Sequence, residues 1–327
     1  MSHQLICVVG STGNQGGGVL SALLESSSPF KVRALTRDPA SSKGQCLVET
    51  YSHRVKEGRL ELVQGDLEDV ESLEKAFEGC YGVFAAFGPG AQPEEGQEAE
   101  EVRQGKNLVN AAKAAGIEHF VYSSLSSINK ESEGKITNVY HHESKAAVAD
   151  YAKQHLKNVT TVQPPAFYSN LASPGWTRRA EDGTAVFCAP FKPTVRLAWI
   201  DDRFDIGSFV AAIFKKGPKE TRDKAYFITS GAASMPEIAN EYHKITGETV
   251  SVEPLSVKEG ADKTATTLGV PHLAEELNVT FEWFNQIYDN LPKEALDGAI
   301  QGVAAELGVK ASSFAQFLER SGWRVGQ

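Results

Sequence analysis

A glycine-rich motif directly after an apolar run constrains this chain more than any other feature. The run covers residues 5–10, and the motif reads Gly10, Ser11, Thr12, Gly13, Asn14, Gln15 and Gly16. Residues 14–25 carry apolar side chains at helical spacing, so the motif joins a strand to a helix. There the first glycine permits a tight turn, the second lets the backbone approach a pyrophosphate, and the third allows close helix packing. The motif therefore predicts a dinucleotide-binding Rossmann fold, and the alternative is a glycine-rich turn without a ligand.

The first half of the chain alternates short apolar runs with amphipathic stretches. This pattern is typical of repeated βαβ units and predicts an α/β fold with a doubly wound parallel sheet. We expect its further strands at residues 31–35, 60–64, 82–87, 119–123 and 159–163. Beyond residue 165 the pattern changes to aromatic and proline-rich segments, with short strands at 226–229 and 250–254 and a helix at 235–246. We therefore predict a Rossmann domain over residues 1–165 and a smaller α+β lobe for a substrate or partner over 166–327.

Composition excludes several classes of protein. Among the 327 residues, 41% are hydrophobic and 23% charged, and no apolar run approaches the roughly 18 residues of a membrane span. The formal net charge of -9 argues against direct nucleic-acid binding, which needs clustered Lys and Arg. The four cysteines lack metal-ligand spacing, and the N-terminus lacks a targeting pattern. We expect a cytoplasmic protein, present also in the nucleus in one alternative, as a monomer or homodimer.

Cofactor choice is expected at the end of the second strand. An acidic residue there binds a ribose 2′-hydroxyl, whereas an arginine accommodates a 2′-phosphate. The chain places Arg37 at this point and Asp38 one residue later. Arg37 therefore predicts NADP(H), while Asp38 keeps NAD(H) as an alternative. A third possibility is that both residues lie in a solvated loop and bind no cofactor. Arg33 and Lys43 could add positive charge, although a surface position explains each of them as well.

Two further segments follow predicted strands at the same edge of the sheet. Asp66 comes after the third strand, where it can accept a hydrogen bond from an adenine amino group or cap the next helix. We assign its neighbour Leu67 to the same site. Phe87 ends the fourth predicted strand and is assigned to the cofactor site as well.

The predicted helix 139–155 contains the sequence Tyr-His-His-Glu-Ser-Lys. His141 and Lys145 are four residues apart and share a helix face, whereas Tyr140 is turned away by roughly 100°. Short-chain dehydrogenases use Tyr-x-x-x-Lys, and here a histidine takes the place of the tyrosine. Beside a lysine ammonium, an imidazole tends to lose its proton, which makes His141 an unreliable acid. We predict catalytic roles for Lys145 and His141, with a polar surface residue as the alternative for His141.

The segment after the sixth strand also reaches the ligand edge of the sheet. Phe167 could pack against a nicotinamide and Asn170 could hold a polar group, unless the segment is only a hinge between the lobes. An apolar substrate pocket is expected from four aromatic side chains: Phe87, Phe167, Tyr168 and Trp176. His142 and Glu143 lack a third metal ligand nearby in sequence, so we predict no metal site.

Taken together, these residues resemble the NmrA-like family, a branch of the atypical short-chain dehydrogenases. The resemblance covers nearly the whole chain and rests on the glycine motif and on the segments 36–39, 64–66, 101–108, 120–123, 141–145 and 165–171. It implies a Rossmann domain with a smaller C-terminal lobe and NADP(H) bound by the glycine loop and Arg37. It also implies that Lys145, Phe167 and Asn170 lie at the nicotinamide end.

The resemblance implies two classes of function. Some members are transcriptional co-regulators that sense the state of the nicotinamide cofactor, and others reduce quinones or small aromatic compounds. Because the tyrosine is missing, we favour a regulator that senses NADP(H) and acts through a protein partner. The alternative is an NADPH-dependent reductase of a small aromatic, quinone or carbonyl substrate. Direct DNA binding is a third hypothesis, which the acidic charge disfavours.

Overall fold

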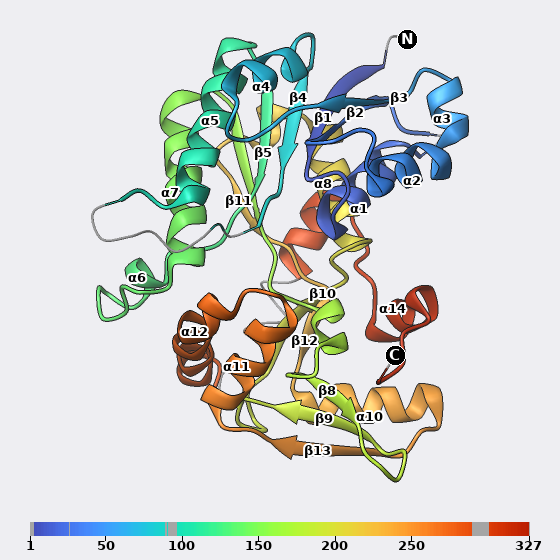
Figure 1. The fold of residues 1–327 in the computed structure, drawn as a ribbon, viewed down its shortest axis with the longest axis vertical. Coiled ribbons are helices and arrows are strands. Elements are labelled where there is room, and N and C mark those ends of the chain that lie inside the picture. Colours follow the sequence, from blue (N-terminus) through green and yellow to red (C-terminus); the bar gives the residue numbers. More distant parts are fainter. Residues whose placement is uncertain (1–2, 26, 89, 91–96, 290–300, 327) are drawn as a thin grey trace.

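The computed structural model describes residues 3–25, 27–88, 90, 97–289 and 301–326. A large sheet flanked by helices forms one part of the molecule, and a smaller part contains two short sheets and several helices (Figure 1). Within the described residues, no helix is both long and apolar enough to cross a membrane.

The large sheet has seven strands in the order β11-β6-β5-β4-β1-β2-β3, and every pairing in it is parallel. The fold is therefore a doubly wound Rossmann fold, as predicted. Its strands are β1 (Gln4–Val9), β2 (Phe30–Thr36), β3 (Leu60–Gln64), β4 (Gly82–Ala85), β5 (His119–Ser123), β6 (Val159–Gln163) and β11 (Ala225–Phe227). Strand β1 pairs with both β2 and β4, so the order reverses at β1 and opens a crevice at its carboxyl end.

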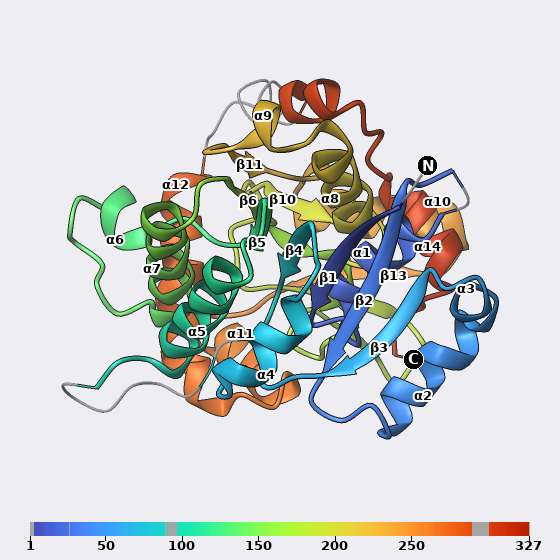
Figure 2. The same ribbon diagram turned by 90° about the horizontal axis from the view of Figure 1, so that it is seen from above.

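Helices cover both faces of this sheet (Figure 2). Ile6 and Val8 of β1 face a core shared with α1 (Asn14–Leu23) and α8 (Asp205–Lys216), while Cys7 and Val9 face the opposite core. The opposite core contains α4 (Val70–Phe77), α5 (Glu100–Ala114) and α7 (Tyr140–His155). Burial on both faces explains the continuous apolar runs of the strands. Shorter helices connect these elements: α2 (Ser42–Thr50), α3 (Ser52–Lys56), α6 (Ile128–Glu131) and α9 (Pro218–Thr221).

The smaller part packs around its own aromatic core. One of its sheets contains β7 (Ala166–Phe167), β10 (Leu197–Ile200) and β12 (Gly231–Ala233), and the other contains β8 (Thr177–Arg179), β9 (Ala185–Ala189) and β13 (Val250–Pro254). Its helical elements are α10 (Met235–Thr246), α11 (Val257–Thr267), α12 (Ala274–Ile287) and α14 (Phe314–Ser321), with the short turns Tyr168–Ala172 and Pro271–Leu273.

The chain returns to the large sheet after residue 165. The predicted sheet has six strands within residues 1–165, whereas the structure adds a seventh, β11, which pairs with β6 and covers its open edge. Helix α8 also packs on α1, and Leu307 joins the same core. A domain boundary at residue 165 stays a prediction, but residues 205–228 lie with the Rossmann sheet. Helix α6 lies within the polar segment 126–138 that precedes α7.

Helices α1 and α8 approach until their backbones touch. A Cβ atom on Gly18 would lie 1.7 Å from the carbonyl oxygen of Arg203, and one on Gly207 would lie 2.3 Å from that of Gly18. Neither position has room for a side chain. This contact fixes α1, whose first turn follows the glycine motif, against the segment that enters from the smaller part.

We expect Gly18→Ala to destabilise the protein by about 3 kcal/mol, because the added methyl group must displace backbone atoms. Chemical denaturation would measure the change. Gly17→Ala is the matched control on the same helix, since its Cβ would meet its nearest neighbour at 3.4 Å. That variant should be neutral or more stable by about 0.5–1 kcal/mol, because alanine favours the helix. Equal stabilities of the two variants would contradict the close contact.

Candidate functional site

The glycine motif forms a tight turn between β1 and α1. Gly10 has a φ of 78°, and a Cβ there would lie 2.1 Å from the carbonyl oxygen of Ala86. A Cβ on Gly16 would lie 2.2 Å from the carbonyl oxygen of Gly10. Helix α1 begins after Gly13, which offers no side-chain cap, and its first turn contains no acidic residue. The turn therefore presents backbone at the positive end of α1, a suitable place for an anion.

The polar residues of the motif attach this turn to its surroundings. The buried Ser11 hydroxyl donates to the carbonyl of Leu35 at 2.9 Å, so this side chain joins the turn to β2. Asn14 Nδ2 donates to the buried carboxylate of Asp202 at 2.8 Å. Gln15 Oε1 accepts from the hydroxyl of Ser123 at 2.7 Å. Thr12 is exposed. The motif is thus held by β2, by β5 and by the loop after β10.

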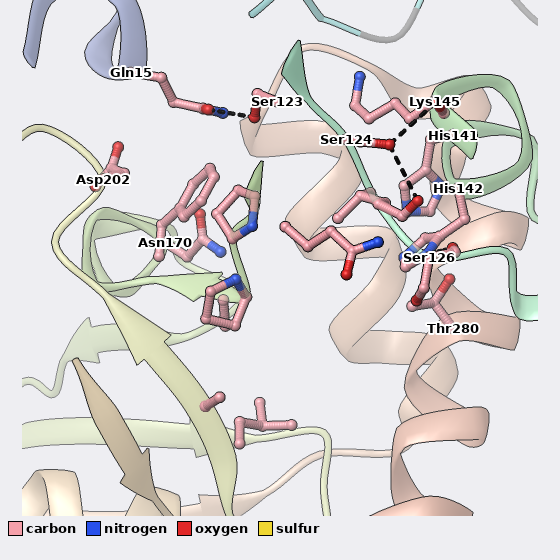
Figure 3. Close-up of a pocket in the computed structure, with 18 of the residues that line it drawn as sticks. Gln15, Ser123, Ser124, Ser126, His141, His142, Lys145, Asn170, Asp202 and Thr280 are labelled. Atoms are coloured by element: carbon pink, nitrogen blue, oxygen red, sulfur yellow. Dashed lines mark hydrogen bonds between the residues drawn. The ribbon is translucent and has the colours of Figure 1, made fainter. Parts of the chain in front are cut away.

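A cavity of about 900 Å³ begins at this turn and extends into the smaller part. Figure 3 shows Gln15 and Ser123 on one side of it and His141, His142 and Lys145 on the other. Ten of the predicted site residues line it: Gly10, Gly13, Asn14, Gln15, Gly16, Phe87, His141, Lys145, Phe167 and Asn170. The structure therefore brings residues from four separate segments of the sequence together at the carboxyl edge of the sheet.

The remaining predicted site residues do not line the cavity: Ser11, Thr12, Arg37, Asp66 and Leu67. Arg37 is exposed just beyond the end of β2, and Asp66 is exposed just beyond the end of β3. Asp66 Oδ1 accepts from the backbone N–H of Glu68, while Asp69 caps α4 instead. Contacts of Arg37, Asp66 and Leu67 with a cofactor stay predictions.

Lys145 is held by a carboxylate that the sequence analysis missed. Its ammonium donates to Glu101 of α5 and, at 3.2 Å, to the carbonyl of Phe87. Glu101 is 2% exposed, and this burial raises the pKa of its carboxyl, while the Lys145 charge lowers it. The sequence carried a signal for this pair. Glu101 lies on the same helical stripe as Leu108 and Ala112, and an acidic residue in an apolar stripe needs a partner.

His141 also contacts a buried carboxylate, which comes from the other part of the molecule. Its Nδ1 lies 2.9 Å from Glu276 Oε2 of α12, and its backbone N–H donates to the same oxygen at 3.0 Å. The ammonium of Lys145, one turn along α7, is paired with Glu101. Tyr140 is 41% exposed and does not line the cavity.

His142 and Glu143 each have a local structural role. His142 Nδ1 donates to the carbonyl of Ser126 at 2.9 Å, and burial lowers the pKa of its ring to about 3. Glu143 accepts from the hydroxyl of Ser127 and from the backbone N–H of Asn129. Within the described part of the chain, no group of three His, Cys, Asp or Glu residues could hold a metal ion.

The far end of the cavity is apolar. Its lining includes Trp176, Phe191, Leu273, Leu277, Phe281 and Phe284. Three of the four aromatic residues predicted for a pocket line the cavity, but Tyr168 does not. Tyr168 packs instead on Trp199 at 5.9 Å and on Phe314 and Phe317, each at 5.2 Å, between ring centroids. Helix α12, which completes this end, was not part of the predicted pocket.

The model of the NmrA-like family matches residues 2–318. This chain belongs to the NmrA-like family. Among solved structures, it is similar to NmrA, a negative transcriptional regulator in complex with NAD, with 22% identity, a TM-score of 0.74 and coverage of 99% of both chains. It is also similar to an NADPH-dependent quinone oxidoreductase of Escherichia coli complexed with NADPH, with 21% identity, a TM-score of 0.67 and coverage of 97% of this chain and 100% of that one.

Curated relatives of this family member include an NmrA-like family domain-containing oxidoreductase of Aspergillus hancockii. The two are 28% identical over 286 residues, which cover 83% of this chain and 80% of the relative. The solved structures show the shared fold. This curated relative carries the name of an oxidoreductase, and the two solved structures are those of a regulator and of an oxidoreductase.

We expect Lys145→Met to lose about 3 kcal/mol of stability at neutral pH, because it leaves the buried Glu101 without its partner. Since burial already raises the pKa of Glu101, removal of the ammonium raises it further. The loss should therefore be small at acidic pH, where Glu101 is protonated in both proteins. It should grow as pH rises above the wild-type pKa of Glu101 and level off above the raised pKa of the variant. Denaturation curves over this range would measure it.

Adding Glu101→Gln to Lys145→Met should recover stability and remove the pH dependence. Lys153→Met is the control on the same helix, because Lys153 is exposed. It should change stability by less than about 0.5 kcal/mol. A double variant less stable than the single variant would contradict a buried Lys145–Glu101 pair.

Proposed function

We propose that this family member is an NADP(H)-dependent oxidoreductase that acts on an uncharged, largely apolar small molecule. One observation carries the proposal. A single cavity runs from the glycine turn, past Lys145 and His141, to an apolar end lined by α12. A protein that only bound a dinucleotide would not need this second compartment, whereas a reductase needs room for a substrate beside the nicotinamide.

The residues around the glycine turn fit a dinucleotide. Any Cβ on Gly10 or Gly16 would collide with backbone, and the uncapped start of α1 suits a diphosphate. A bound dinucleotide would supply the hydride for a reduction. Lys145 would bind the nicotinamide ribose from its place between Glu101 and the carbonyl of Phe87. Phe167 and Asn170 line the adjoining wall of the cavity.

The regulatory hypothesis was motivated by the missing tyrosine. His141 now offers a substitute, because it lines the same cavity as Lys145 and is held by Glu276. For this reason we propose turnover instead of sensing alone. Action through a protein partner stays a prediction, which the likeness in fold to the NmrA regulator keeps open.

The direct test combines binding with turnover. Calorimetry with NADPH, NADP and NADH would measure the affinity of each, and absorbance would follow NADPH oxidation with menadione, phenanthrenequinone and aromatic aldehydes. We expect NADPH to bind more tightly than NADH and at least one apolar carbonyl compound to be reduced. Tight NADPH binding without turnover on any of these compounds would contradict an oxidoreductase and favour a sensor.

Arg37→Ala tests the cofactor preference. If Arg37 contacts a 2′-phosphate, its removal should raise the Kd for NADPH about 10-fold, equivalent to about 1.4 kcal/mol, and leave the Kd for NADH within two-fold. Arg222→Ala is the control, because it removes the same charge at a distant place. Arg222 is exposed and follows α9 at the opposite end of the strands. Equal losses for both cofactors would refute the assignment.

Leu277→Arg tests the apolar compartment. A guanidinium in this wall should lower kcat/KM for a hydrophobic carbonyl compound at least 10-fold, since the charge has no partner there. The Kd for NADPH should stay within two-fold, because Leu277 belongs to α12 and lies in the apolar end. Gln286→Arg adds the same group on an exposed part of the same helix and should leave both constants unchanged. A similar result for the two variants would sink the proposed substrate site.

A further inference from the structure

We propose that Glu276 is a positioning residue for His141: it keeps a proton on Nδ1 and leaves Nε2 as the ring nitrogen that exchanges a proton with a substrate. The use of this proton in catalysis rests on the proposed function. The positioning itself rests on contacts between α12 and α7 and can be tested without turnover.

The contacts are specific to one oxygen atom. Glu276 Oε2 receives the backbone N–H of His141 at 3.0 Å and lies 2.9 Å from its Nδ1. Because a carboxylate only accepts hydrogen bonds, the proton of this contact belongs to Nδ1. Glu276 is 2% exposed and does not line the cavity, whereas His141 does (Figure 3). The carboxylate therefore holds the imidazole from behind.

The start of α7 gives Glu276 its place. Val139 precedes the helix and makes no side-chain cap, so the first-turn N–H groups need other acceptors, and the carbonyl of Val139 accepts from His142. Glu276 supplies one of these acceptors from α12, and the positive end of the helix dipole favours its negative charge. One carboxylate thus caps a helix of the Rossmann part and orients a side chain that faces the cavity.

Several titratable side chains surround His141. The groups around it are Glu276 of α12, Glu101 of α5, and Lys145 and His142 of α7. The two carboxylates are buried; Lys145 contacts Glu101, and His141 contacts Glu276. His142 is excluded as the donor, because burial lowers its pKa to about 3 and Ser126 accepts from its Nδ1.

This arrangement fits a proton donor for a carbonyl reduction. Protonated His141 would give its Nε2 proton to the carbonyl oxygen as the carbonyl carbon accepts a hydride from the reduced nicotinamide dinucleotide. The substrate becomes an alcohol, the dinucleotide is oxidised, and His141 becomes neutral with its proton still on Nδ1. Glu276 accepts the same hydrogen bond before and after the transfer, so the ring need not reorient. Water then returns a proton to Nε2.

Nuclear magnetic resonance of the full-length protein with ¹⁵N-labelled histidine tests the positioning. Comparison with His141→Gln assigns the two ring nitrogens of His141. In the wild type we expect the neutral ring mainly as the Nδ1–H tautomer. Glu276→Leu should shift it to the Nε2–H tautomer that a solvated histidine prefers. Glu276→Gln keeps an acceptor oxygen and should retain more of the Nδ1–H tautomer. An Nε2–H ring in the wild type, or a tautomer unchanged in Glu276→Leu, would overturn the proposal.

Two further measurements separate positioning from folding and from the proposed function. Glu275→Gln is the control for both, since Glu275 is exposed beside Glu276 on α12 and should leave tautomer and kinetics unchanged. With NADPH and phenanthrenequinone, Glu276→Leu should lower kcat about 100-fold at an unchanged KM, as expected for loss of an acid, and Glu276→Gln should lower it less. A purely structural role would lower stability alone and refute the proposal. If Glu276→Leu shifts the tautomer of His141 but the wild-type protein shows no turnover, the positioning is supported and the oxidoreductase is refuted.

Discussion

The structure depends on a steric constraint, the contact of backbone with backbone along one side of α1. Gly10, Gly16 and Gly18 each lie where a Cβ would enter the carbonyl group of another segment. These contacts bring the first turn of α1 onto β1 and its next turn onto the segment that includes Arg203 and Gly207. A methyl group at any of these points must displace backbone. The geometry of the glycine turn and the attachment of α8 therefore depend on the same short helix.

Buried charge connects the two parts of the molecule at the cavity. Glu101 holds Lys145 within the Rossmann part, and Glu276 reaches His141 from the smaller part. An isolated buried carboxylate is costly, so each of them favours the conformation in which its partner is present. The lining of the cavity, polar near α7 and apolar along α12, consequently depends on how α12 packs against the start of α7. Because of this coupling, the smaller part belongs to the site and does not only enclose the cavity.

The local elements could be predicted from sequence because they rest on nearby residues. Strands β3, β5, β6 and β13 and helix α10 have the predicted bounds, since apolar runs, helical spacing and caps mark them directly. Other features lacked a local signal. The run that forms β11 could pair with any open strand edge, and β6 offers that edge only once the sheet is folded. Likewise Tyr168 looked like a pocket residue, but its ring packs into the aromatic core.

The sequence by itself determined the Rossmann architecture, the glycine turn and the shared face of His141 and Lys145, because each follows from spacing within a few residues of the chain. Tertiary structure alone decided which groups surround that face. Glu276 lies 135 residues after His141. Its carboxylate reaches His141 only when α12 of the smaller part packs against the start of α7. Spacing along a helix shows which residues share a face, but it does not show which residue of a distant helix contacts that face. Here that residue sets the charge and the proton position at the site.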